Sequence, residues 1–164
     1  EALGRLGGAL KGNVVRWSLL PAFAGEFQGL KFSIILIPAG KNTPPVLRLS
    51  LVKNSALRLS VYRESAISQI GKKMGLVREI KVFDEAFDRD FLIFSNKPEQ
   101  ARNYFTDSTK RQAVRELFDS GFESLSVNGK TIETKKPRYH LESDLAPGSA
   151  AAFVQKLAIL AGGL

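Results

Sequence analysis

The sequence predicts an α+β fold: one antiparallel sheet whose apolar face is covered by helices. Between residues 13 and 63, apolar and polar side chains alternate with period two, as in strands that bury one face. The intervening segments are too short for helical crossovers, so neighbouring strands must run antiparallel. Most of the helical periodicity follows later in the chain, which indicates segregated helices instead of repeated βαβ units.

Length and composition support one domain over residues 1–164. The chain opens on Glu1 instead of Met, so we expect a soluble fragment of a longer chain. No stretch approaches the ~20 apolar residues of a membrane-spanning helix. The sequence holds no cysteine, which excludes disulfides and thiolate metal sites but does not choose a compartment.

The first 63 residues contain a short helix and a predicted four-strand meander. Leu3, Leu6 and Leu10 have helical spacing within residues 1–12. The strands that follow are predicted at residues 14–20, 26–37, 46–53 and 56–63. Their separators are Pro21, the Pro-rich segment 38–45 and a turn around residues 53–55.

The second half supplies the remaining strands and most helices. Helical spacing and end signals predict helices at residues 64–75, 99–105, 110–119 and 149–161, with a helical turn from 83 to 91. Further strands are predicted at 76–82 and 90–95. Asn128-Gly129 predicts a hairpin between strands 122–127 and 130–134. The helix at 149–161 is apolar nearly all round, so we expect it to be buried against the sheet.

The charge is asymmetric. The net charge is +8, with 12 Lys and Arg against 4 Asp and Glu in residues 1–80, and 12 against 12 in the rest. A basic surface on one part of the fold suits an anionic partner, whereas simple solubility is the alternative explanation.

Residues 47–66 are nearly the same ten residues written twice, and their LRLS core belongs to a wider pattern. Each of the four meander strands carries a basic residue, an apolar residue and a serine in succession. Because side chains alternate in a strand, the basic residue and the serine share one face. The four triplets are Arg16-Trp17-Ser18, Lys31-Phe32-Ser33, Arg48-Leu49-Ser50 and Arg58-Leu59-Ser60.

If the triplets align, their four basic residues form a positive band across the sheet. Like charges directly opposite one another are destabilising, so such a band would suggest an anion-binding face; a solvated face with staggered charges is the alternative. Trp17 and Phe32 are expected on the apolar face, which makes nucleic acid a less favoured partner than lipid headgroups or an acidic protein.

No catalytic or metal-binding constellation is evident. Asp84, Glu85, Asp88 and Asp90 do not follow the EF-hand spacing, and helix capping explains them better than a metal site. His140 is the only histidine and has no GxSxG nucleophile motif to serve. We therefore expect a non-enzymatic protein without a cofactor.

The run FDxxFDRxFLI…SNxPExAR…T…R..V..LF resembles an uncharacterised bacterial domain family with a loose FDxxF…PExAR pattern, over residues 57 to 135. The matching positions are Phe83 or Phe87 with Asp84 or Asp88, then Phe91, Pro98, Glu99, Ala101, Arg102, Arg111, Arg115 and Leu117. The family carries no assigned activity, so the resemblance transfers no site residue. It implies a soluble domain that follows one or two N-terminal membrane helices.

The sequence leaves three functional hypotheses. The first is a binding domain whose basic sheet face, with Arg16, Lys31, Arg48, Arg58, Ser18, Ser33, Ser50 and Ser60, meets lipid headgroups or an acidic protein, in a membrane-anchored bacterial protein. The second is a small-ligand carrier with an apolar pocket between the sheet and the C-terminal helix. The third is an enzyme of unrecognised type. Ligand identity and oligomeric state do not follow from the sequence.

Overall fold

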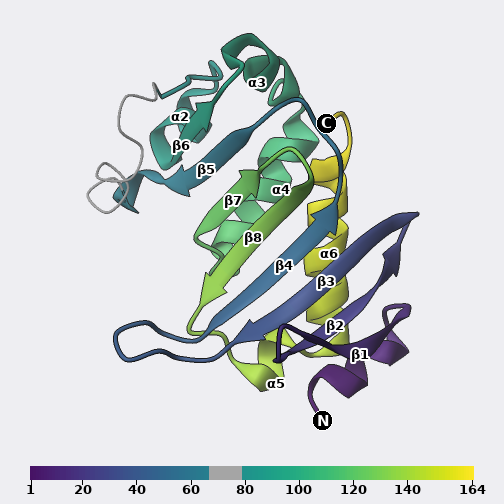
Figure 1. Ribbon diagram of the computed structural model, residues 1–164. Helices are drawn as coiled ribbons and strands as arrows, with labels where there is room; N and C mark the ends of the chain where they lie inside the picture. The colour runs from purple at the N-terminus through teal and green to yellow at the C-terminus, as the bar shows by residue number, and fades with distance from the viewer. Residues whose placement is uncertain (67–78) are drawn as a thin grey trace.

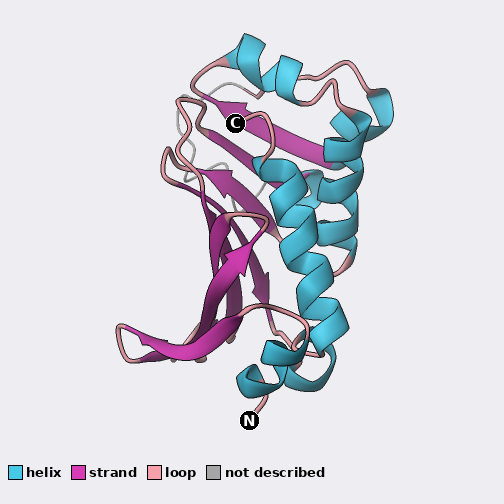
Figure 2. Ribbon diagram, turned by 90° about the vertical axis from the view of Figure 1, so that its right-hand side faces the viewer, coloured by secondary structure: helices cyan, strands magenta, loops and turns pink. Residues whose placement is uncertain are grey.

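The structure is a computed structural model, and it describes residues 1–66 and 79–164. One eight-stranded antiparallel sheet is covered by helices on a single face, as Figures 1 and 2 show, so the α+β prediction is confirmed. The strand order is β1-β2-β3-β4-β8-β7-β5-β6. We call the helix-covered side of the sheet the inner face and the other side the outer face.

The strands are β1 (Gly12–Trp17), β2 (Leu20–Phe27), β3 (Leu30–Ile37), β4 (Val46–Val52), β5 (Leu59–Arg63), β6 (Phe91–Ser95), β7 (Ser124–Val127) and β8 (Thr131–Pro137). The helices are the 3-10 helices η1 (Leu3–Gly8) and η2 (Glu64–Ala66), and α2 (Glu85–Asp90), α3 (Pro98–Tyr104), α4 (Ser108–Asp119), α5 (Leu141–Asp144) and α6 (Pro147–Ala161).

The meander exists, but its members differ from the prediction. It consists of β1 to β4. The chain turns at Gln28-Gly29 inside the expected strand 26–37, so the start of that segment belongs to β2 and the rest forms β3. Gln28 and Gly29 both have positive φ, which suits a tight hairpin turn. Pro21, expected to separate strands, lies near the start of β2, where the missing N–H is tolerated.

The prediction that β5 joins the meander beside β4 is wrong. The β7–β8 hairpin lies between β4 and β5, and β5 pairs with β7 and β6. The segment between β4 and β5 bonds to the tip of that hairpin, since the Lys53 and Ser55 amides donate to the carbonyls of Lys130 and Gly129. These bonds carry the chain past the tip, so it does not fold back on β4. The hairpin itself confirms the Asn128-Gly129 prediction.

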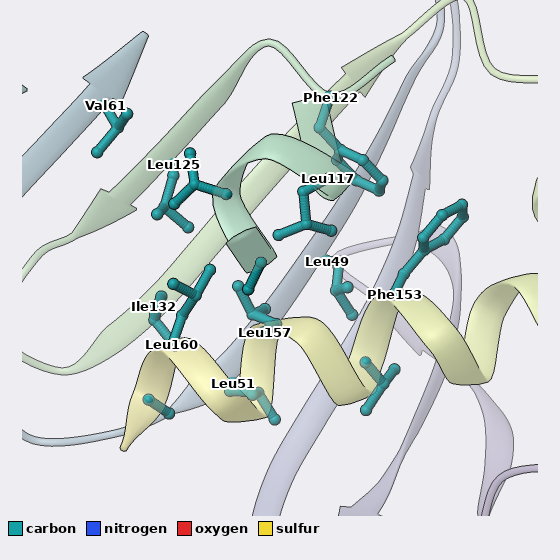
Figure 3. Close-up of a cluster of buried hydrophobic side chains, with 14 of the residues drawn as sticks. Leu49, Leu51, Val61, Leu117, Phe122, Leu125, Ile132, Phe153, Leu157 and Leu160 are labelled. Carbon is teal, nitrogen blue, oxygen red and sulfur yellow. The ribbon is translucent and has the colours of Figure 1, made fainter. Parts of the chain in front are cut away.

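The inner face is packed against α6, and α4 lies beside α6, behind β7 and β8 in Figure 1. Figure 3 shows Leu49 and Leu51 of β4 facing Phe153, Leu157 and Leu160 of α6. These side chains are buried within one continuous core. Helix α6 is apolar nearly all round because it has the sheet on one side and α4 on another.

This packing also decides one functional expectation. Among the described residues, buried side chains of β4, β8 and α6 fill the space where the apolar pocket between the sheet and the C-terminal helix was predicted (Figure 3). Well-packed interiors leave few voids larger than a water molecule. A ligand therefore needs a different surface of this fold.

Two predicted elements lie largely outside the described residues. Of the helix expected at 64–75, the structure describes only η2. Of the strand expected at 76–82, it describes a single bridge between Glu79 and Phe94 at the edge of β6. Before α3, the Asn96 Oδ1 atom accepts from the Arg58 amide, and Lys97 occupies the N-cap position of the helix.

Candidate functional site

The outer face is concave around β1 to β4. Figure 2 shows the sheet bent, with its lower strands turning away from the helices. Ala22 and Ile35 are directly opposite each other on the outer face and are almost fully buried, although no helix covers them. Curvature explains this burial, because side chains converge on the concave side of a bent sheet.

The concavity holds a groove of about 680 Å³, within the range of small-molecule sites. Strands β1, β2, β3, β4 and β8 all contribute to it. Trp17, Ala24 and Val52 give it apolar surface, Lys31 and Arg48 contribute positive charge, and Glu26 and Glu133 contribute carboxylates. The groove therefore combines apolar walls with two cationic and two acidic side chains.

At the edge of the concave region, two glycines let β1 approach β2 closely. Gly12 and Gly25 are directly opposite each other in the β1–β2 ladder. A Cβ atom on Gly25 would lie 1.9 Å from the Lys11 carbonyl oxygen, and one on Gly12 would lie 2.4 Å from the Ala24 carbonyl oxygen. The main chain between η1 and β1 therefore lies so close to Gly25 that residue 25 has no room for a side chain.

The charges of the groove are unevenly compensated. Arg48 lies directly opposite Lys135 on the outer face, an arrangement of like charges that destabilises a sheet. Glu133 forms an ion pair with Lys135 at 3.1 Å and so offsets one of them. Within residues 1–66 and 79–164, neither Arg48 nor Lys31 forms an ion pair, although Glu26 lies opposite Lys31.

Serines from three predicted triplets do align. Cross-strand pairing links Ser33 to Ser50, Ser50 to Glu133, Glu133 to Ser126, and Ser126 to Ser60. The Ser33 and Ser50 hydroxyls are hydrogen-bonded at 2.9 Å. The outer face thus carries a row of hydroxyls beside the groove, which can donate to or accept from a polar group.

The predicted band of four basic residues does not form. Lys31 and Arg48 share the outer face, but they lie in different cross-strand rows. Arg16 shares a face with Val14, which pairs with the core residue Phe23, so it points to the inner side. Arg58 precedes β5 and lies against the Gly129 turn, while Ser18 belongs to the β1–β2 turn.

Trp17 is on the outer face, contrary to the prediction, whereas Phe32 is buried on the inner face as expected. The cause is the two-residue turn Ser18-Leu19, which places Trp17 opposite Leu20 and so shifts β1 by one residue relative to the other triplets. A one-residue shift moves every side chain to the other face. The turn length was the signal that sequence reasoning missed, together with Glu133 and Ile35 as groove residues.

The acidic residues at 84–90 have structural roles. Asp84 caps α2 by accepting from the Phe87 amide at 2.9 Å, and it pairs with Arg111. The Phe87 amide and, next among the attractive contacts, the Arg111 charge lower the pKa of Asp84 despite partial desolvation. Asp88 accepts from the Val82 and Phe83 amides. The capping interpretation is therefore confirmed.

The other candidate site residue of the sequence, His140, precedes α5, and its backbone amide donates to the buried carboxylate of Asp144. Across the described ranges, the structure shows no group of three or more His, Cys, Asp or Glu side chains arranged to hold a metal ion. Nor does any helix there have the length and apolarity needed to cross a bilayer.

Comparisons with known proteins inform the fold. No family model matches the chain, so the resemblance to an uncharacterised family gains no direct support. No curated protein matches either. Among solved structures, the chain resembles the mycobacterial trehalose monomycolate transport factor A, with a TM-score of 0.55 and 12% identity over 98% of this chain and 94% of that one. At that identity, the likeness shows a shared fold.

Proposed function

We propose that this protein is a non-enzymatic binding domain that holds an amphiphilic lipid in the groove on its outer sheet face. The observation that carries this proposal is the groove itself, where exposed Trp17 and Val52 offer apolar surface in the same concavity as the cations of Lys31 and Arg48. An amphiphile with an anionic head group satisfies both features at once. The similar structure is that of a transport factor for trehalose monomycolate, which agrees with a lipid-binding role.

Within the groove, the acyl part would lie against Trp17, Ala24 and Val52. The head group would lie near Arg48, where a negative charge relieves the repulsion between Arg48 and Lys135. Hydroxyls of the serine row, beginning with the Ser33–Ser50 pair, supply further hydrogen bonds. Membrane anchoring of the whole protein, expected from the sequence, remains part of this proposal.

A lipid fits the groove better than nucleic acid does. Proteins that bind single strands place several aromatic side chains along a positively charged track. Here Trp17 is the one strongly exposed aromatic residue of the groove, and a single aromatic platform does not suit a run of stacked bases.

The chain offers a built-in reporter, because Trp17 is its only tryptophan. We expect dodecyl phosphate, added below its micellar concentration, to shift Trp17 emission to shorter wavelength, since the indole moves into an apolar environment. Dodecyl maltoside, with a neutral head group, should bind more weakly. Binding of dodecyl phosphate should also weaken as salt is raised, because Lys31 and Arg48 are partly exposed.

The decisive variant is the double substitution Lys31→Ser, Arg48→Ser, expected to weaken dodecyl phosphate binding by about tenfold or more through lost charge-assisted contacts. The matched control is Arg58→Ser, from the same sequence motif but outside the groove, which should bind like the wild type. Equal loss in both variants would contradict the groove assignment. A single-stranded oligonucleotide that bound in place of the amphiphile would overturn the proposal.

A further inference from the structure

Exposed apolar side chains gather at one edge of the sheet. Among the described residues, seven large hydrophobic side chains are exposed, and four of them belong to β1 and its turn. These four are Val14, Val15, Trp17 and Leu19. Leu19 is the most exposed, at 85%. The opposite edge of the sheet is different, since the Ile80 amide donates to the Ile93 carbonyl and partly covers β6.

The turn that carries Leu19 is unfavourable for its backbone. Ser18 and Leu19 have φ values of 46° and 71°, the left-handed region that glycine and asparagine adopt more readily. In the β2–β3 turn, Gln28 likewise has a positive φ, but glycine, Gly29, stands at the second position that Leu19 occupies here, and the β7–β8 turn has Gly129 in this region. Leu19 therefore adds neither packing nor backbone stability to the folded chain.

We propose that the β1–β2 hairpin tip inserts into the surface of an anionic lipid bilayer and places the groove at the membrane. Leu19 and Trp17 would enter the boundary between head groups and acyl chains, where tryptophan is favoured. Arg16 adjoins them, and residues 2–25 contain no Asp or Glu, so the tip matches an anionic surface in charge as well as in polarity.

The placement of Trp17 links the tip to the groove. Trp17 flanks the turn and also lines the groove, so a hairpin seated in a bilayer brings the groove to the lipid surface. The inference rests on the proposed function, since it assigns the place where the lipid is acquired. A second copy of the chain paired along β1 is the competing occupant, but such pairing would leave Leu19 exposed beyond the strand.

The test is Leu19→Gly, measured by co-sedimentation with vesicles of phosphatidylglycerol and phosphatidylcholine. Glycine relieves the backbone of the turn, so the variant should unfold no more easily than the wild type. Removal of the leucine side chain should weaken vesicle binding by about tenfold. Vesicles of phosphatidylcholine alone should bind the wild type weakly.

The matched control is Phe83→Gly. Phe83 is 83% exposed and has a φ of 66°, but it lies in the loop before α2, beside the other edge of the sheet. This variant should bind vesicles as the wild type does. Equal loss in Phe83→Gly, or unchanged binding in Leu19→Gly, would overturn the inference. So would a wild-type dimer that Leu19→Gly dissociates and that does not sediment with vesicles.

The two proposals can fail separately. Leu19→Gly should still bind monomeric dodecyl phosphate with wild-type affinity, because Leu19 does not line the groove. If dodecyl phosphate binds but vesicle binding does not depend on Leu19, only the docking of the tip is refuted. If vesicle binding depends on Leu19 while dodecyl phosphate fails to bind, the groove assignment is refuted, and the docking of the hairpin tip to the bilayer is supported.

Discussion

Replacing Gly25 with alanine should detach β1 from the sheet. The new Cβ would lie 1.9 Å from the Lys11 carbonyl oxygen, which is main chain and cannot rotate away as a flexible side chain would. The Lys11 segment must therefore shift, and the 3.1 Å hydrogen bond from the Glu26 amide to that oxygen is lost or stretched. The strain affects the strand that brings Trp17 to the groove.

The size of the effect follows from two contributions. Overpacking typically costs about 1–3 kcal/mol, and a hydrogen bond contributes about 1 kcal/mol. Detachment of β1 limits the total, because five of its six residues are exposed and little apolar burial is lost when it leaves. We therefore expect Gly25→Ala to lower the free energy of unfolding by about 2–3 kcal/mol.

Denaturant unfolding measures the total, and amide hydrogen exchange locates it. Protection should fall in β1 and less in β4 or β8, and binding of dodecyl phosphate should weaken because Trp17 moves. The control is Gly148→Ala, at an exposed position in α6 where a new Cβ meets nothing within 4 Å. If Gly25→Ala were as stable as this control, the close approach of Lys11 to residue 25 would not constrain the sheet.

Two further predictions concern the helix layer. Tyr104 is buried, and its hydroxyl donates to the Leu160 carbonyl of α6. Burial raises the pKa of Tyr104, so the donor proton is retained. Tyr104→Phe should lower the free energy of unfolding by about 1 kcal/mol in denaturant titrations, and an unchanged midpoint would contradict the role of that hydrogen bond. The pKa of Asp84 is lowered in the folded state, so its stabilisation is full above the ordinary carboxyl range and is lost as pH falls through the folded value. In unfolding titrations from about pH 6 to about pH 2, Asp84→Asn should lose less stability than the wild type. Identical curves for the wild type and Asp84→Asn would refute this.

Local patterns determined much of the fold. Period-two alternation located β3 and β4, Asn128-Gly129 located the β7–β8 hairpin, and the apolar spacing of residues 149–161 located α6. These features depend on neighbours within a few residues, and sequence reports such contacts directly. The position of β5 depended on a hairpin much later in the chain, which local patterns do not contain.

The site was less predictable for a related reason. Lys31, Arg48, Ser33 and Ser50 could be assigned to one face from alternation alone, and they do share it. The register of β1 depended on where β2 begins, and the interpretation of Pro21 as a separator hid that boundary. The close approach of β1 to β2 depends on Gly12 and Gly25, whose contact is between strands and is not contained in a local sequence pattern.

The insertion of the β7–β8 hairpin between β4 and β5 also bears on how the chain reaches this state. β4 and β5 carry nearly the same residues and are neighbours in sequence, so a local hairpin between them could close early, as local contacts form faster than distant ones. That pairing must open, or be avoided, before Thr131–Pro137 and Ser124–Val127 can take their places. The internal repeat thus gives this protein a built-in competitor to its native topology, and folding should slow when the Asn128-Gly129 turn is weakened.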